Sequence, residues 1–320
     1  MSMPPYSSIG GDTLLIDTGL YRPQMAACYL IEDHGELAVI DCGTRHSVPR
    51  ILEAIGYLDA DPGDVRWIIP THVHLDHAGG AGRLAHHCHN ASVALHPKGL
   101  PHMLDPSRLQ AGATEVYGEE AFARDFGALD PIPENRCVAA ADSQAFELGT
   151  RRLQFIHTPG HANHHGCVLD LTSAYLFSGD TFGLAYRELA DPDPYLVATT
   201  TPVAFDPDAW QASLDRLLAL SPAAVCLTHY GKYPDPAVLA PQLRASIEAH
   251  TAIALAEESD RSPGRSQRLE RAVSQLLIEG AVAHSGVSER RAQELLGHDI
   301  QLNAQGLDVW LKRRARHRQT

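Results

Sequence analysis

A histidine-rich run directly follows a short apolar stretch of this sequence, and it restricts the possible folds more than any other segment. Residues 71–80 read Thr-His-Val-His-Leu-Asp-His-Ala-Gly-Gly. In an extended segment alternate side chains share a face, so His72, His74 and Asp76 are expected to point the same way. His77 then falls where two glycines predict a turn into a helix. Several ligand-type side chains therefore gather in one loop.

Imidazole and carboxylate groups at this density indicate a metal site. They suit zinc, iron or manganese better than calcium, which prefers oxygen ligands throughout. Because His72 and His74 lie two residues apart on a loop, the site is not the helical His-Glu-x-x-His arrangement. The alternative interpretation is a polar surface turn that is rich in histidine.

Strand-like runs occur in two groups, each followed by helices. Strands are predicted at 13–17, 27–32, 36–41 and 92–96 in the first group and at 145–148, 152–157, 167–171, 174–178 and 223–228 in the second. Helices are predicted at 47–58, 82–89, 119–126 and 207–220. This order predicts two facing sheets with helices on both sides.

After residue 236 the pattern changes to helices alone. They are predicted at 239–258, 267–284, 288–296 and 307–316. We therefore expect one domain over 1–236 and a C-terminal helical extension over 237–320. No long polar linker separates the two parts, so the extension is expected to be a subdomain rather than an independent module. Its expected role is to form a wall of the substrate cleft or a homodimer interface.

The motif His72-x-His74-x-Asp76-His77 after a short apolar strand resembles the signature of the metallo-β-lactamase superfamily. Four further motifs match that family in the expected order: Asp41-Cys42-Gly43, Thr158-Pro159-Gly160-His161, Ser178-Gly179-Asp180-Thr181 and Leu227-Thr228-His229. The resemblance implies an α/β fold, the four-layer αββα sandwich, here with a C-terminal helical subdomain.

The resemblance also implies a dinuclear metal site. One metal is expected on His72, His74 and His161 and a second on Asp76, His77 and His229, with Asp180 between them. Two divalent ions are implied, with zinc as the first choice and iron or manganese as the others. They would share a hydroxide as the nucleophile. Asp76 is the expected catalytic group that orients this hydroxide and receives its proton.

Other residues are assigned supporting roles. Asp41 is expected to accept the second N–H of a ligand imidazole, and His165 is expected to support the ligands. Tyr230 is a candidate hydrogen-bond donor to a carbonyl oxygen, with packing beside a ligand as the alternative. The candidates for lining the substrate cleft are Tyr21, Arg22, Phe182 and Tyr186, for which a surface loop or core packing is the competing interpretation.

One motif departs from the family pattern. Glyoxalase II-type hydrolases usually follow the third-motif histidine with threonine and glycine, whereas this chain has His161-Ala162-Asn163-His164-His165-Gly166. His161 itself still matches the motif. The departure leaves any glutathione specificity open.

Composition excludes some classes of partner and location. A net charge of −13 and a pI near 5.8 argue against a nucleic-acid partner, which needs a basic surface. The six cysteines form no Cys-x-x-Cys pair, which is typical of a reducing compartment. No signal-like or membrane-spanning run is present. A cytoplasmic protein that acts on a small molecule and binds no membrane is expected.

The leading hypothesis is a metal-dependent hydrolase that cleaves a thioester, lactone or ester. The alternative from another enzyme class is a mono-iron oxidoreductase like the superfamily's persulfide dioxygenases. A third hypothesis is a catalytically idle ligand-binding protein of the same fold, against which the complete ligand set argues. β-Lactam hydrolysis ranks last, because such enzymes are usually exported.

Overall fold

The protein is described by a computed structural model that covers residues 4–190, 193–201, 203–260 and 262–318. The chain divides into two compact units, each assembled from separate segments. Unit 1 comprises Met1–His157, His164–Gly179 and Ser221–Pro234, and unit 2 comprises Thr158–Asn163, Asp180–Leu220 and Asp235–Thr320. Each unit is described by itself. The predicted domain boundary after residue 236 stays a prediction.

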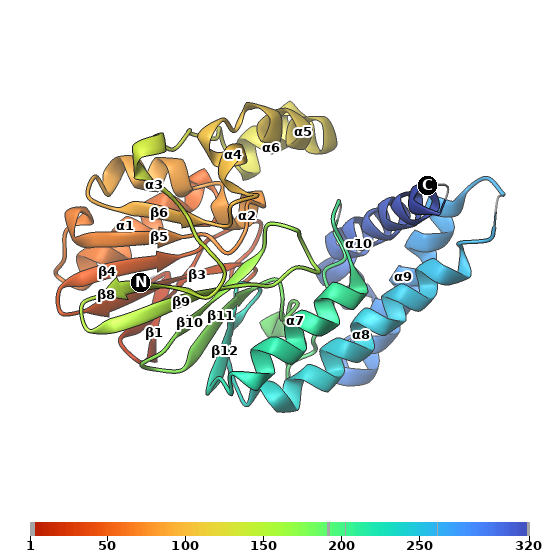
Figure 1. The fold of residues 1–320 in the computed structure, drawn as a ribbon. Helices are drawn as coiled ribbons and strands as arrows, with labels where there is room; N and C mark the ends of the chain where they lie inside the picture. Colours follow the sequence, from red (N-terminus) through yellow and green to blue (C-terminus); the bar gives the residue numbers. More distant parts are fainter. Residues whose placement is uncertain (1–3, 191–192, 202, 261, 319–320) are drawn as a thin grey trace. The chain divides into compact units, whose positions relative to one another are not determined.

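Unit 1 contains two β-sheets, and most of their strands are labelled in Figure 1. The first sheet has the order β1 (Tyr6–Gly10), β2 (Thr13–Asp17), β3 (Ala27–Asp33), β4 (Glu36–Ile40), β5 (Val65–Ile69), β6 (Ser92–Leu95) and β7 (Cys137–Ala139). The second has the order β13 (Gly231–Pro234), β12 (Ala224–Leu227), β11 (Tyr175–Gly179), β10 (Gly166–Asp170), β9 (Arg151–His157) and β8 (Gln144–Leu148). The structure confirms the predicted strands and adds β1, β7 and β13, which the sequence reading missed.

Alternation along the strands explains the layers of unit 1. In β2, Leu14 and Ile16 join a core with the helix residues Ile51 and Leu84, whereas Leu15 joins a core with residues of the second sheet such as Phe155. Successive side chains of a strand point to opposite faces, so both faces of the first sheet are covered. One face packs on helices and the other on the second sheet.

The helices of unit 1 follow the strands of the first sheet. They are α1 (Val48–Tyr57), α2 (Leu75–Ala78), α3 (Ala81–His87), α4 (Leu100–Leu104), α5 (Ser107–Tyr117) and α6 (Glu119–Asp125), with 3₁₀ turns η1 (Arg45–Ser47), η2 (Pro62–Asp64) and η3 (Glu134–Arg136). The helices predicted at 47–58, 82–89 and 119–126 are confirmed. The sequence reading missed α2, α4 and α5.

Parallel strand pairs place the motif residues at common sheet edges. Ile40 at the end of β4 pairs with Ile69 at the end of β5, so Asp41 and the histidine-rich loop emerge side by side. Gly179 at the end of β11 pairs with Leu227 at the end of β12, which brings Thr228 to the edge of the second sheet. Carboxyl ends of parallel strands meet at one edge, where ligands are commonly held.

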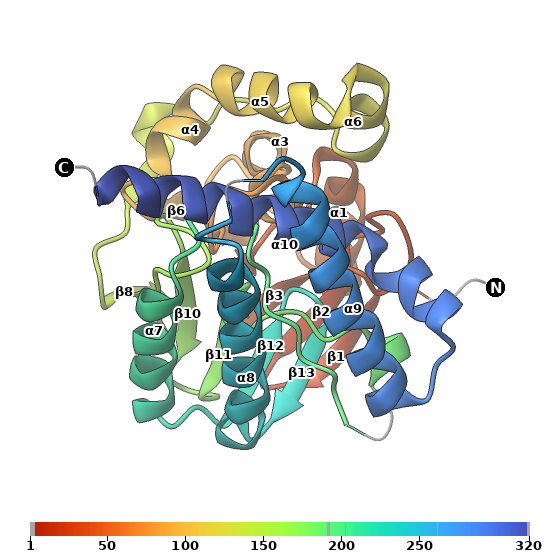
Figure 2. The same ribbon diagram turned by 90° about the vertical axis from the view of Figure 1, so that its right-hand side faces the viewer.

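Unit 2 is helical apart from its connecting segments, and its helices are seen in Figure 2. They are α7 (Pro207–Ala219), α8 (Pro236–Ala256), α9 (Arg265–Ser285) and α10 (Glu289–His317), with the 3₁₀ turn η4 (Arg187–Leu189). Helix α10 packs against α9 and α8, and α7 packs against α8. Among the described residues, no helix combines the length and the apolarity needed to cross a bilayer.

The prediction of two separate helices at 288–296 and 307–316 is wrong, because α10 is continuous. The intervening residues 297–306 begin and end with glycine and carry several polar side chains. In the structure their polar groups are used for packing: Asn303 Oδ1 accepts the amide of Thr200, and Asp299 accepts the hydroxyl of Tyr186. A Cβ at Gly306 would overlap the Thr200 carbonyl, so the glycine permits a close approach.

Candidate metal centre

The histidine-rich loop is extended only over its first half. Residues 71–74 are irregular, and α2 begins at Leu75. The expectation that Asp76 shares an extended face with His72 and His74 is therefore wrong. Asp76 lies in the first turn of α2 together with His77, because the chain has already turned into a helix. This change of backbone separates the loop's ligand-type residues into two sets, as the family motif implied.

Three side chains of unit 1 form one group of candidate ligands. Asp76, His77 and His229 each offer one ligand atom, and these atoms lie within 4.8 Å of one another. Oδ2 of Asp76 is 3.2 Å from Nε2 of His229 and 3.6 Å from Nε2 of His77. Both histidines are buried, whereas the side chain of Asp76 is 27% exposed. The group is thus enclosed on the imidazole side and open at the carboxylate.

The second ring nitrogen, Nδ1, of each of these histidines is hydrogen-bonded to an acceptor on the side away from Asp76. Nδ1 of His77 lies 2.8 Å from Oδ2 of Asp41, and Nδ1 of His229 lies 2.9 Å from the carbonyl oxygen of Met25. Because a carboxylate and a carbonyl accept hydrogen bonds, each Nδ1 carries the proton. This tautomer directs the lone pair of Nε2 toward Asp76, which is how histidines that bind metals are usually oriented.

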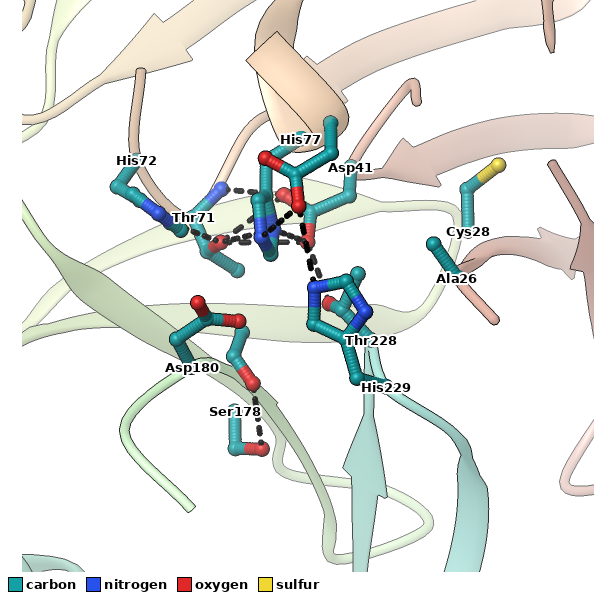
Figure 3. Close-up of polar contacts among 12 residues, drawn as sticks. Ala26, Cys28, Asp41, Thr71, His72, His77, Ser178, Asp180, Thr228 and His229 are labelled. Carbon is teal, nitrogen blue, oxygen red and sulfur yellow. Dashed lines mark hydrogen bonds and ion pairs between the residues drawn. The ribbon is translucent and has the colours of Figure 1, made fainter. Parts of the chain in front are cut away.

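Asp41 organises the strand ends around this group. Its carboxylate accepts hydrogen bonds from the amide of Thr71 at 2.7 Å and from the hydroxyls of Thr71 and Thr228 at 3.0 and 2.7 Å. Figure 3 shows these residues beside His77. Asp41 has φ +55°, a left-handed conformation that aspartate tolerates better than most residues. Its buried carboxylate thereby links β4, β5 and β12.

His72 and His74 lie beside this group in unit 1. Their ring centroids are 4.3 Å apart, and the centroid of His72 is 4.1 Å from that of His77. Buried His165 lies 4.7 Å from His72, measured between ring centroids. The imidazoles leave space only for a glycine at the end of β11, because a Cβ at Gly179 would lie 2.6 Å from His165 Nε2 and collide with Thr71.

His161 and Asp180 lie in unit 2, where they contact each other. Nε2 of His161 is 3.4 Å from Oδ2 of Asp180, and both side chains are buried. Nδ1 of His161 lies 2.7 Å from the carbonyl oxygen of Thr199, so this nitrogen carries the proton and leaves Nε2 free to accept a metal ion. The complete set of seven ligands draws on both units and stays a prediction.

The predicted cleft residues have different environments. Tyr21 is 45% exposed, and its ring meets that of Phe126 edge-on with centroids 6.2 Å apart. Phe182 and Tyr186 are fully buried in unit 2, where the Tyr186 hydroxyl donates to Asp299. Their burial favours the packing role over the cleft role.

Two further predicted residues lie in unit 1. Arg22 is in the loop between β2 and β3, next to Tyr21, and it is half-buried. Tyr230, the catalytic candidate, is buried in the core between the two sheets, where it packs with Tyr29 and Phe177.

The sequence reading missed two kinds of residue near the ligands. Backbone carbonyls such as those of Met25 and Thr199 carry no sequence signal. Tyr117, at the end of α5, lies within the electrostatic influence of Asp76. Burial raises the pKa of Tyr117 to about 12, and the Asp76 charge adds to the rise. No helix was predicted between residues 99 and 118, so no pattern pointed to this tyrosine.

The donors fit a divalent cation of the zinc class. The Nε2 atoms of two buried imidazoles converge on a partly exposed carboxylate, and the Nδ1 atoms already have acceptors. Convergence of two imidazoles on one carboxylate is favourable when a cation lies between them. The group can therefore hold a metal ion, and it can polarise a substrate or water next to Asp76.

Known proteins match most of the chain. A sequence profile of the metallo-beta-lactamase superfamily matches residues 21–229. A metallo-beta-lactamase fold-containing protein of Sulfurisphaera tokodaii is 27% identical over 213 residues, which cover 65% of this chain and 74% of that protein. An acyl-coenzyme A thioesterase of Gallus gallus is 30% identical over 167 residues, 48% of this chain and 57% of the relative. The match thus spans less than two thirds of that thioesterase.

Solved structures resemble the chain over nearly its whole length. The archaeal protein from Sulfolobus tokodaii superposes with a TM-score of 0.65 at 23% identity, covering 93% of this chain and 99% of that one. A metallo-beta-lactamase family protein of Thermus thermophilus gives a TM-score of 0.63 at 22% identity, covering 91% and 95%. These likenesses concern the fold alone, and they confirm the predicted fold with two sheets and C-terminal helices.

Proposed function

Because the chain belongs to the metallo-beta-lactamase superfamily, we propose that it is a metal-dependent hydrolase of thioesters, with lactones and simple esters as neighbouring substrates. The observation that carries the proposal is the group of Asp76, His77 and His229, whose ligand atoms lie within 4.8 Å of one another. The thioester preference is supported by the distant acyl-coenzyme A thioesterase relatives.

We propose a dinuclear site with the ligands that the motifs imply. Two divalent ions are expected, with zinc preferred over iron or manganese because the donors are mainly imidazole nitrogens. His72, His74 and His161 would hold the first ion, and Asp76, His77 and His229 the second, with Asp180 shared. The contact between His161 and Asp180 supports the pairing of these two motifs.

Bound divalent cations would supply Lewis acidity, which lowers the pKa of water toward about 7 and polarises a carbonyl. The residues of the chain then accept the proton of the attacking water and keep the ligand imidazoles in position. Asp76 is partly exposed, so its carboxylate can accept the proton of an attacking water. Asp41 and the Met25 carbonyl fix the rings of His77 and His229, which keeps the Nε2 atoms in place during turnover.

The substrate side of the proposal rests on three residues of unit 1. Tyr21 and Arg22 remain the candidates for contact with substrate, because their loop is partly exposed. Tyr230 stays the predicted hydrogen-bond donor to the carbonyl oxygen, with packing as the alternative that its burial in the core between the two sheets favours. A cytoplasmic location and a homodimer formed through the C-terminal helices stay predictions.

The mono-iron dioxygenase alternative assigns no metal to the second group of ligands. A single iron would leave Asp76, His77 and His229 with no metal to hold, although the two imidazoles are both oriented toward the carboxylate. This arrangement favours the two-metal hydrolase. Oxygen consumption with a persulfide substrate and one tightly bound iron per chain would favour the oxidoreductase.

The proposal is tested by metal analysis and a substrate panel. Purified protein is assayed for bound metal and for hydrolysis of acyl-coenzyme A, acylglutathione, acyl-homoserine lactone and aryl ester substrates. His72→Ala and Asp180→Ala are expected to abolish hydrolysis with the circular dichroism spectrum retained. His86→Ala is the matched control, since His86 is an exposed histidine of the neighbouring α3. Full activity in either ligand variant would refute the assignment.

A further inference from the structure

A small apolar cluster lies beside the metal ligands of unit 1, apart from its two main cores. We call it the α5–α6 cluster. Its members are Leu20, Ala26, Leu75, Phe122, Phe126 and Leu129, with Leu109, Ala113 and Tyr117 of α5 packed against them. Its aromatic rings contact one another: Phe126 is 5.1 Å from Tyr117 and 5.9 Å from Phe122, measured between centroids.

Helix α5 presents an apolar stripe that the protein covers only in part. Leu109, Ala113 and Tyr117 are spaced four residues apart, so they lie on one face of the helix. All three are half-buried, and no residue of α5 is fully buried. A surface helix normally buries its apolar stripe against a core. The α5 stripe therefore offers apolar surface to a further group.

The stripe is continuous with the candidate catalytic site. Leu75 belongs to the cluster and directly precedes the ligand Asp76. The rings of Tyr117 and Tyr21 both contact Phe126 of the cluster, with centroids 5.1 and 6.2 Å from it. A substrate whose carbonyl lies at Asp76 can thus extend its adjoining part along the cluster.

The charges around the stripe indicate which part of a substrate it suits. Helices α5 and α6 carry Glu115, Glu119, Glu120 and Asp125 against two arginines, Arg108 and Arg124. Arg124 is also paired with Asp125 at 2.8 Å. Such a surface disfavours the phosphates of a nucleotide leaving group and favours a neutral apolar chain.

We propose that the α5–α6 cluster binds the acyl chain of the substrate and that the α5 stripe makes the enzyme prefer long chains. This inference rests on the proposed hydrolase function, which it extends to a substrate class. From Leu109 to Tyr117 the stripe spans about 12 Å along the helix, so a long chain buries more apolar surface than an acetyl group. Ala113, at its centre, has the smallest side chain of the three, so it sets how much room the chain has.

The test compares two tryptophan substitutions on the same helix. Ala113→Trp fills the stripe, whereas Val116→Trp adds the same bulk at a position that is 63% exposed. Hydrolysis is measured with acetyl-, butyryl-, octanoyl-, lauroyl- and palmitoyl-coenzyme A. We expect Ala113→Trp to lower kcat/KM for the long chains by about tenfold or more while leaving the acetyl substrate within about twofold. Val116→Trp should keep the wild-type profile.

A binding measurement separates this inference from the proposed reaction. Cis-parinaric acid, a fluorescent long-chain fatty acid, is titrated into wild type and both variants. We expect it to bind the wild type and Val116→Trp equally and Ala113→Trp at least about tenfold more weakly. Should Ala113→Trp fail to fold, Leu109→Ser provides the same comparison by removing apolar surface from the stripe.

The outcomes distinguish two failures. If the wild type binds the fatty acid through the stripe but hydrolyses none of the thioesters, the hydrolase proposal fails and the apolar site stands. If thioesters are hydrolysed but Ala113→Trp changes acetyl and palmitoyl substrates equally, or changes neither, the acyl-chain site is refuted. No binding of the fatty acid to the wild type would also refute it.

Discussion

Replacing Asp41 by asparagine is expected to weaken metal binding without removing a ligand. The Asp41 carboxylate lies 2.8 Å from Nδ1 of His77 and holds the proton on that nitrogen. An asparagine of the same shape brings an NH₂ group into the carboxylate's position, and an NH₂ group only donates. If this group faces His77, the imidazole must carry its proton on Nε2. A protonated Nε2 cannot bind a metal ion.

The expected size follows from what the carboxylate does. Loss of a residue that orients a ligand histidine typically lowers metal affinity about 10- to 100-fold, equivalent to about 1.4–2.8 kcal/mol. Folding is also weakened, because the buried carboxylate accepts hydrogen bonds from Thr71 and Thr228. Losing hydrogen bonds to a charged group costs about 1.5–3 kcal/mol, so the free energy of unfolding should fall by a similar amount.

The assay is a competition titration of zinc against a chelator, at a temperature where both proteins are folded. Asp33→Asn is the matched control. Asp33 accepts hydrogen bonds from the amide and hydroxyl of Thr150 and from Arg151, and no candidate ligand is among these donors. We expect Asp33→Asn to lower stability with zinc affinity unchanged. Equal zinc affinity in Asp41→Asn and wild type would refute the orienting role of Asp41.

Two further predictions concern packing and pH. Gly179→Ala should lower activity by about tenfold or more, because its Cβ would displace Thr71 and His165 beside the ligands; unchanged turnover and metal content would contradict the tight packing there. Burial lowers the pKa of His250 from 6.5 to about 4. As pH falls, His250 therefore takes up a proton in the unfolded state of the protein before it does so in the folded state. The free energy of unfolding should therefore drop by up to about 3 kcal/mol between pH 6.5 and 4, and His250→Gln should lose that part of the drop. Identical pH profiles from denaturant titrations of the two proteins would contradict it.

The sequence predicted the parts of this fold that depend on short-range patterns. Alternation of apolar residues and turn residues predicted the strands. A ligand-type residue predicted at a strand end also lies at a strand end in the structure. Asp41 is an example, since it directly follows an apolar run. Asp76 does not share a face with His72 and His74, because α2 begins at Leu75 and the alternation of an extended segment ends there.

The remaining features depend on contacts that no local pattern encodes. The acceptor for His229 Nδ1 is the carbonyl of Met25, which lies 204 residues earlier in the chain. Every residue has such a carbonyl, so nothing marks Met25 in the sequence. The α5 stripe was not predicted because the apolar residues of this helix are few, and the helix buries none of them completely.

Anomalous diffraction from crystals of the zinc-loaded protein would show whether the predicted ligands meet around two metal ions. We predict two zinc peaks in each chain. One should be ligated by Asp76, His77 and His229, the other by His72, His74 and His161, with Asp180 contacting both. A single peak without His229 among its ligands, or zinc bound away from these residues, would contradict the proposed site.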